Sequence, residues 1–384
     1  MIKKIPMNEF PLLDSRRGIP LFHPKISSLG IKMVKETLST RWIGQGPKVD
    51  LFEKKFKNFF LNNKLHAIAV GSGTDALHLA YLLADIKKGD EVLAPVFTCT
   101  ATNLPLLYIG AKPVFVDIDP TTMNLNIEDI EKKITKKTKA IVCVDYGGVP
   151  NNYLKLISIC KKNKIKLISD AAHSLGTKYL NKYACMYSDF TIFSFQAIKT
   201  LTTGDGGMLI IKNKKLIEKA KRLRWFGIDR SKKQLGIWEN DIKELGYKYQ
   251  MNDIAASLGL AGLKEINNII KKRILLFKKY EQNLNHKYIK IIGQSETKEY
   301  KNSCWLITVL VEKNKNSLMK KLRRNGIESA QVHYRNDRYS VFGKQKGKLH
   351  NMNNLENKYL VLPLYPKMKL TDVKKICKII NSGW

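Results

Sequence analysis

The sequence predicts an α/β protein with a large domain, a mostly parallel seven-stranded sheet between helices, and a smaller α+β domain at its C-terminal end. Two observations predict the large domain. Seven short segments between residues 66 and 211 are almost continuously apolar, which is typical of strands covered on both faces. Helical segments stand between most of them, as crossovers of a parallel sheet do. A third observation, the change of pattern after about residue 255, predicts the second domain.

The large domain follows a proline-punctuated arm over residues 1–25 that we expect to lie on the body of the protein. A helix over roughly 27–40 and a glycine-rich turn lead into an amphipathic helix, where Val49, Phe52 and Phe56 form one apolar face. The strands are expected at 66–70, 91–97, 113–119, 140–146, 164–172, 189–195 and 206–211, with helices at 74–83, 127–132 and 152–162 between them.

The second domain is expected to start inside a long helix over residues 253–284. Strands near 304–311 and 328–334 and a last helix over roughly 371–380 follow. We therefore divide the chain into an arm (1–25), a large domain (26–255) and a small domain (256–384), with a boundary that falls within a helix.

Charge limits the class of partner. The 384 residues have a formal net charge of +35, with 57 lysines and only 11 arginines. A surplus of this size can indicate nucleic acid or an anionic membrane, but arginine, which contacts phosphates and bases bidentately, is scarce here and the lysines are scattered. We favour lysine use at solvated positions, and we expect no nucleic acid and no membrane as partner. An anionic substrate would be attracted by this charge.

The sequence predicts no metal site, disulfide or membrane span. The closest two of its six cysteines, Cys143 and Cys160, are 17 positions apart, which fits no compact zinc pattern. No apolar run approaches the length of about 18 residues that a spanning helix needs. The N-terminal segment lacks the apolar core of a secretory signal, so we expect free thiols and a cytoplasmic location.

A glycine-rich turn is the first segment that carries chemistry. Gly73, Thr74 and Asp75 follow an expected strand and open the helix at 74–83. Ligands of open α/β sheets bind at such strand ends, and the free amides of a helix N-terminus can bind phosphate. An ordinary N-cap would give the same pattern.

Two further strand ends supply an acid and an amine. Asp170 could hold a cationic ring nitrogen, with Ala172 under a flat ligand; the alternative is a helix cap beside a surface His173. Lys199 follows the apolar strand expected at 189–195, which contains Ser194, and precedes a glycine-rich loop. A lysine in a partly dry place loses pKa and becomes a nucleophile toward aldehydes; the alternative is a solvated surface lysine.

A fourth segment, residues 246–253, precedes the long helix. It carries Tyr247, Lys248, Tyr249 and Gln250, that is, two aromatic rings, a cation and an amide. Taken alone, an ordinary polar helix start explains it.

A phosphate-binding turn, an acid for a pyridine nitrogen and a reactive lysine, in this order, are the parts of a pyridoxal 5′-phosphate (PLP) site. Over nearly its whole length the chain resembles the DegT/DnrJ/StrS family of PLP-dependent sugar aminotransferases, which have the aspartate aminotransferase architecture, fold type I. The matching segments are WIGQGP at 42–47 with Phe52-Glu53, GTDAL at 73–77, DAAH at 170–173, SF at 194–195 with Lys199, GDGG at 204–207, MND at 251–253 with LGL at 258–260, and VHY at 332–334.

The resemblance implies a role for each residue. Lys199 would hold PLP covalently and, once free, transfer protons; Asp170 would pair with the pyridine nitrogen, and His173 would lie near the phenolic oxygen. The cofactor would also contact Gly73, Thr74, Asp75, Cys99, Ala172 and Ser194. The turn with Lys248 would reach the neighbouring subunit's site, so a homodimer is implied.

The resemblance also implies the substrates. The amino donor would be an amino acid, expected to be L-glutamate, and the acceptor a nucleotide-linked keto sugar, expected to be a 4-keto-6-deoxyhexose used in amino-sugar and surface-polysaccharide synthesis such as that of O-antigen. A 3-keto or acidic keto sugar is the alternative. The candidates for substrate contacts are Trp42, Arg224, Trp225, Arg230, His333 and Arg335, with ordinary surface polarity as the other explanation.

Two other functions are alternatives to this one. A dehydratase of the same family would have histidine in place of Lys199. A regulatory or nucleic-acid-binding member would need a helix-turn-helix or a basic arm, which the sequence does not show.

The sequence departs from the family pattern at three positions. Lys248 stands where an asparagine usually contacts the partner's phosphate, and a lysine could still pair with it. Cys99 stands where an aromatic ring usually stacks on the cofactor, so sulfur would cover that face. Asp205 replaces a glutamate.

Overall fold

The computed structural model describes residues 18–61, 65–237, 241–343 and 347–384, so residues 1–17 of the expected arm lie outside it. The large domain is built on one seven-stranded sheet with the order β1-β9-β8-β5-β4-β2-β3. Strand β9 is antiparallel to both neighbours and the other adjacent pairs are parallel, as predicted. The strands are β1 (His66–Val70), β2 (Glu91–Pro95), β3 (Lys112–Val116), β4 (Thr138–Val144), β5 (Lys166–Asp170), β8 (Phe190–Ser194) and β9 (Gly207–Ile211).

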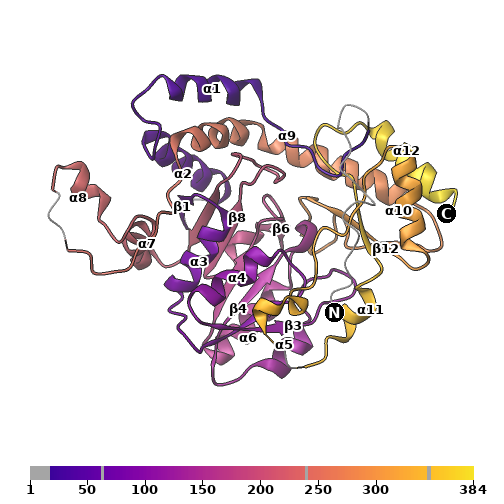
Figure 1. Ribbon diagram of the computed structural model, residues 1–384, viewed down its shortest axis with the longest axis horizontal. Helices are drawn as coiled ribbons and strands as arrows, with labels where there is room; N and C mark the ends of the chain where they lie inside the picture. The colour runs from indigo at the N-terminus through magenta and orange to yellow at the C-terminus, as the bar shows by residue number, and fades with distance from the viewer. Residues whose placement is uncertain (1–17, 62–64, 238–240, 344–346) are drawn as a thin grey trace.

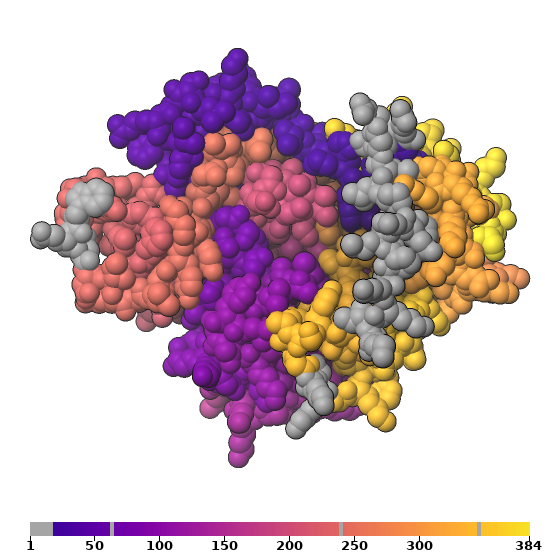
Figure 2. Space-filling view, in the orientation of Figure 1, coloured from indigo at the N-terminus to yellow at the C-terminus, as the bar shows by residue number. Residues whose placement is uncertain are grey.

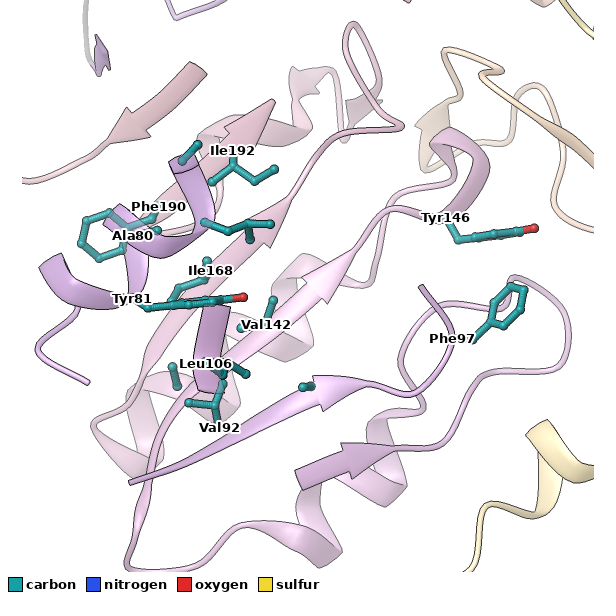
Figure 3. Packing of buried hydrophobic residues seen from close by; sticks show 14 of the residues in the cluster. Ala80, Tyr81, Val92, Phe97, Leu106, Val142, Tyr146, Ile168, Phe190 and Ile192 are labelled. Carbon is teal, nitrogen blue, oxygen red and sulfur yellow. The ribbon is translucent and has the colours of Figure 1, made fainter. Parts of the chain in front are cut away.

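Helices cover both faces of this sheet (Figure 1). In β4, Val142 lies in the same core as Tyr81 and Leu106 of the helices on one face (Figure 3). Its neighbour Ile141 packs with Leu156 on the other face. Both sets of alternate side chains are therefore buried, which explains why the strands are apolar throughout. The helices are α3 (Gly73–Leu83), α4 (Thr100–Tyr108) and α7 (Ile217–Arg224) on the first face, and α2 (Pro47–Phe60), α5 (Ile127–Lys133), α6 (Tyr153–Asn163) and the start of α9 (Asp253–Asn283) on the second.

The C-terminal part contains a separate three-stranded antiparallel sheet with the order β10-β12-β13, which confirms the smaller α+β domain. Leu276 and Tyr280 of α9 and Ile376 of the last helix lie in its core. The elements are β10 (Ile289–Ile291), β12 (Ile307–Val311), α10 (Lys315–Arg324), α11 (His350–Leu355), β13 (Tyr359–Leu362) and α12 (Leu370–Asn381).

The strand predicted near 328–334 is wrong. Only Ala330 pairs with this sheet, through an isolated bridge to Val361 of β13. The backbone then leaves the sheet and runs to the large domain, where Arg335 forms a bridge with Phe97. The segment is only partly buried, and its Ala330 and Val332 pack against the core that contains Phe97 of the large domain and Val361 of β13.

Helix α9 links the two parts. Its residues up to Ile266 pack with α2 and the large sheet, and Leu276 and later residues pack in the small domain. This change of partners falls within the helix, and the boundary at 255/256 stays a prediction.

The described part of the arm lies against the small domain. Ile19 pairs with Ile327, and the ring of Phe22 stacks on Trp305 at 5.7 Å. Helix α1 (Ser28–Leu38) then packs along α9.

The remaining elements lie at the periphery. Helix α8 (Arg230–Gln234) projects from the body beside α7, opposite the C-terminal part (Figures 1 and 2). The short strands β6 (Lys178–Tyr179), β7 (Lys182–Tyr183) and β11 (Tyr300–Lys301) form a third sheet. In the described ranges, no helix has the length and apolar character needed to cross a bilayer.

Candidate active site

The predicted phosphate-binding turn and Ser194 come together at the start of α3. Ser72 caps this helix, its hydroxyl accepting from the Asp75 amide at 3.0 Å. Gly73 lies so close to β8 that a Cβ there would be 2.9 Å from the Cβ of Ser194. The missing side chain lets the Ser194 hydroxyl approach the helix N-terminus, where a phosphate would bind. Burial raises the pKa of the Asp75 carboxyl to about 6.

Asp170 ends β5 as a buried, oriented carboxyl group. Its Oδ2 accepts from the Thr102 hydroxyl at 2.7 Å and its Oδ1 from the Ala172 amide at 3.1 Å. Burial raises the pKa of Asp170, and these hydrogen bonds and the charge of Lys199 act against that rise. Turns, not a helix, follow Asp170, so the helix-cap alternative is wrong. A carboxyl group held in this way can pair with a cationic ring nitrogen.

Lys199 lies beside Asp170 rather than on the open surface. Its Nζ is 3.9 Å from the ring centroid of Trp305. Burial lowers the pKa of Lys199 to about 8, and the nearby Asp170 and Cys99 act in the opposite direction. An amine with this pKa is partly unprotonated near neutral pH and can attack an aldehyde.

His173 is the centre of a column of stacked rings. The Trp305 ring lies 3.8 Å from it on one side, and the His333 ring lies 5.3 Å from it at an interplanar angle of 4°. The Gly147 amide donates to His173 Nδ1 at 3.4 Å, so the ring hydrogen belongs on Nε2. Burial and the charge of Lys199 hold the pKa of His173 well below its ordinary value. His173 is thus a fixed, neutral imidazole and not a surface residue.

Trp305 and Phe22 were missed by sequence reasoning. Trp305 precedes the apolar strand β12, and its sequence context is that of an ordinary core residue. Phe22 belongs to the arm, which has no hydrophobic periodicity. Thr102 was missed too, although it follows three residues after Cys99, at the segment already singled out.

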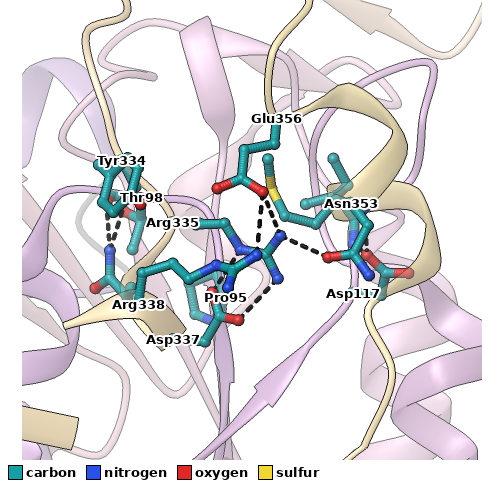
Figure 4. A network of polar contacts seen from close by, with 12 residues as sticks. Pro95, Thr98, Asp117, Tyr334, Arg335, Asp337, Arg338, Asn353 and Glu356 are labelled. Atoms are coloured by element: carbon teal, nitrogen blue, oxygen red, sulfur yellow. Dashed lines mark hydrogen bonds and ion pairs between the residues drawn. The ribbon is translucent and has the colours of Figure 1, made fainter. Parts of the chain in front are cut away.

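Two candidate substrate residues are engaged elsewhere. The buried Arg335 donates to Asp337, Asn353 and Glu356 (Figure 4). The buried Arg224 pairs with Glu53 at 2.6 Å and donates to a backbone carbonyl of β1. These partners give both arginines a structural role, and a contact of either with substrate stays a prediction.

The other candidates gather near the turn before α2. Arg230 donates to the Gln45 carbonyl, and its guanidinium lies 5.9 Å from the ring of Trp225. Trp42 packs near Gly46 in the same turn. Lys248 pairs with Trp225 through a backbone bridge, on the projecting side of the molecule. Their roles stay predictions, whereas His333 lies in the ring column.

A model of the DegT/DnrJ/EryC1/StrS aminotransferase family matches residues 24–381. The chain belongs to this family. It is 32% identical to a GDP-perosamine synthase of Escherichia coli O157:H7, over 95% of this chain and 98% of that protein. It is 30% identical to a UDP-4-amino-4-deoxy-L-arabinose--oxoglutarate aminotransferase of Shewanella sediminis, over 96% and 98%. A Streptococcus pneumoniae structure assigned as a sugar aminotransferase in its PMP form is similar with a TM-score of 0.89, at 28% identity over 95% and 98%.

Membership in the DegT/DnrJ/EryC1/StrS family makes the protein a PLP-dependent sugar aminotransferase with the predicted fold type I architecture. It acts with an amino donor and a keto sugar, so it is an enzyme and the alternative of a regulator without activity is wrong. The residues present fit PLP: Lys199 offers an amine, Asp170 an acid for the ring nitrogen, and Gly73 with Ser194 a place for phosphate. In the described residues no cluster of metal-ligating side chains is present.

Proposed function

We propose that the protein transfers an amino group from L-glutamate to C4 of a nucleotide-linked 4-keto-6-deoxyhexose, as a step in amino-sugar and surface-polysaccharide synthesis. The observation that carries the catalytic part is the pair of Lys199 and Asp170 at the carboxyl end of one sheet, with a lysine pKa of about 8. The names of two relatives contain GDP and UDP, which supports a nucleotide-linked sugar as the acceptor. The second name also contains 4-amino, which supports amination at C4, and oxoglutarate, which supports L-glutamate as the donor. A net charge of +35 favours an acceptor that carries a pyrophosphate.

PLP supplies an electron sink for the carbanion that forms at the amino acid's α-carbon. In our proposal Asp170, held by Thr102 and by the Ala172 amide, keeps the ring nitrogen protonated. Lys199 would bind the cofactor when no substrate is present. Once the amino donor has displaced it, its free amine would accept the proton from the donor's α-carbon and return it later. The neutral His173 would donate through Nε2 to the phenolic oxygen of the cofactor. The Trp305 ring stacks on His173 and excludes water from that side.

We assign the phosphate to the start of α3 and to the hydroxyl of Ser194, and one face of the ring to Ala172. Cys99, which is exposed at the N-terminus of α4, is assigned to the other face. A sulfur atom covers less of the ring than an aromatic side chain would. The two half-reactions share this one site, so we expect ping-pong kinetics.

We also propose that the active unit is a homodimer. Leu235 and Leu245 in the projecting segment are 78% and 80% exposed, and Phe226 and Ile242 nearby are also exposed. Large apolar side chains gathered in this way usually mark an interface. A second copy would cover them and bring its Lys248 to the phosphate of the first site.

The test is a panel of keto sugars, each incubated with the PLP-loaded enzyme and L-glutamate and analysed by mass spectrometry. The proposal expects an amino sugar and 2-oxoglutarate in equal amounts from a nucleotide-linked 4-keto-6-deoxyhexose. Amination of only a 3-keto or an acidic keto sugar would replace the acceptor, and turnover with another amino acid alone would replace the donor.

A further inference from the structure

We infer that Thr102 is a positioning residue for Asp170, and that it acts through a chain of two buried hydroxyl groups that begins at Thr98. The inference rests on the role of Asp170 proposed above. Thr98 and Thr102 are 2% and 0% exposed, so water does not compete for their hydroxyls. Neither was a site candidate on sequence grounds.

The direction of the hydrogen bonds follows from counting hydrogens. A threonine hydroxyl has one hydrogen to donate, and that of Thr102 points to Asp170 Oδ2 at 2.7 Å. The bond between Thr98 Oγ1 and Thr102 Oγ1, at 2.9 Å, must then be donated by Thr98. Both hydroxyls thus point their hydrogens toward the carboxylate. Such a chain stabilises an acceptor at its end, so it favours the ionised form of Asp170.

The chain is held from both sides by buried groups. Tyr81 donates to the Thr102 carbonyl at 2.6 Å, and Asn336 donates to the Thr98 carbonyl at 2.9 Å. Asn336 also accepts from Asn103, which follows Thr102 in α4, at 2.8 Å. Helix α4 is therefore fixed to the segment after His333, so the backbone that carries the Thr102 hydroxyl is held beside Asp170.

The other groups near Asp170 do not take over the role of the Thr102 hydroxyl as a hydrogen-bond donor. In the described chain the titratable groups that interact with Asp170 are Lys199 and Tyr81, and His173 follows it three residues later. The pKa of Tyr81 is raised by burial and by Asp170, so this phenol stays neutral. His173 is neutral as well, because burial lowers its pKa. When Lys199 is bound to the cofactor it no longer offers a free ammonium group, and Thr102 and the Ala172 amide remain as the donors to Asp170.

The experiment measures the dissociation constant of PLP from the apoprotein between pH 5 and 8, for the wild type, Thr102→Val and Thr102→Ser. Binding that needs ionised Asp170 weakens as the pH falls through the pKa of that carboxyl. A hydrogen bond to a charged group contributes about 1.5 kcal/mol, or about one pKa unit. In Thr102→Val this low-pH loss should therefore begin about one pH unit higher, and Thr102→Ser should restore the wild-type profile.

Two controls separate this role from packing. Thr191 is a buried threonine on β8 whose hydroxyl donates to the Cys185 carbonyl, so Thr191→Val tests the loss of a buried hydroxyl elsewhere. It should leave the pH profile unchanged. Thr98→Val should shift the profile in the same direction as Thr102→Val, but less, and it decides the matter if Thr102→Val does not fold.

Unchanged pH profiles in both Thr102→Val and Thr98→Val would overturn the inference. Asp170→Asn separates this failure from that of the proposed function, because it should remove the part of the low-pH loss that comes from protonation of Asp170 and leave the part that comes from Lys199. If Asp170→Asn has the wild-type profile, the role of Asp170 itself is wrong. If only the threonine variants resemble the wild type, the role of Asp170 stands and that of Thr102 falls.

Discussion

Asp170 carries the electrostatic part of the chemistry at the scale of single residues. A carboxylate that is buried and fixed stabilises a cationic ring far more than one in water. We expect Asp170→Asn to fold and to bind PLP, while kcat falls by several orders of magnitude. The loss should appear in kcat more than in KM, because the interaction strengthens in the transition state. Single-turnover rates measured beside the melting temperature check this, and normal turnover would remove Asp170 from the reaction.

Lys199 should titrate unusually low even without cofactor. Burial disfavours its charged form and lowers the pKa to about 8, against an ordinary lysine value of about 10.4. Labelling of the apoprotein with a limiting amine reagent, followed by peptide mass spectrometry, gives the rate at Lys199 as a function of pH. The midpoint should lie near pH 8. A midpoint near 10 would mean that Lys199 is solvated.

At the scale of elements, Gly73 decides how closely α3 approaches β8. A methyl group there would lie 2.9 Å from the Cβ of Ser194 and would push the serine from the helix N-terminus. We expect Gly73→Ala to fold and to bind PLP about tenfold more weakly, the loss of one hydrogen bond to a charged group. Gly44→Ala is the matched control, since a Cβ at Gly44 has no atom within 4 Å. Equal PLP affinities of the two variants would contradict this account of the turn.

Asp253 joins two of the segments on which the family resemblance rests. Its carboxylate accepts from the amides of Gly46, Lys48 and Val49 at 2.8–3.1 Å and so caps α2 from the start of α9. We expect Asp253→Ala to reduce the free energy of unfolding by about 2 kcal/mol, with a smaller loss for Asp253→Asn. Denaturant unfolding measures this, and a change below about 0.5 kcal/mol in Asp253→Ala would show that the cap is unimportant.

These elements also show what the sequence could and could not predict. Apolar runs and their spacing predict all seven strands, because burial on both faces leaves a local pattern. They fail at 328–334, where the partly buried chain pairs with β13 at Ala330 alone. The order of motifs predicts Lys199, Asp170 and Ser194, because each ends or follows a strand of the same sheet. Trp305 and Thr102 could not be predicted, since stacking on His173 and a bond to Asp170 depend on segments far apart in the chain.

The whole molecule sets the oligomeric state. The exposed apolar residues of the projecting segment and the position of Lys248 lead us to expect a dimer whose sites are completed across the interface. Sedimentation at working concentration should show a dimer, and a fully active monomer would contradict this. We expect Lys248→Ala to remain dimeric and to raise the PLP dissociation constant about tenfold, or about 1.4 kcal/mol for one charge-assisted contact.

The measurement that tests the central claim most directly is borohydride reduction of the PLP-loaded enzyme followed by peptide mapping. Reduction makes the bond between the cofactor and its lysine permanent, so mass spectrometry identifies that lysine among 57. The account predicts that the cofactor is found on Lys199 and that Lys199→Ala yields no labelled peptide and no turnover. Cofactor on another lysine, or full activity of Lys199→Ala, would contradict it.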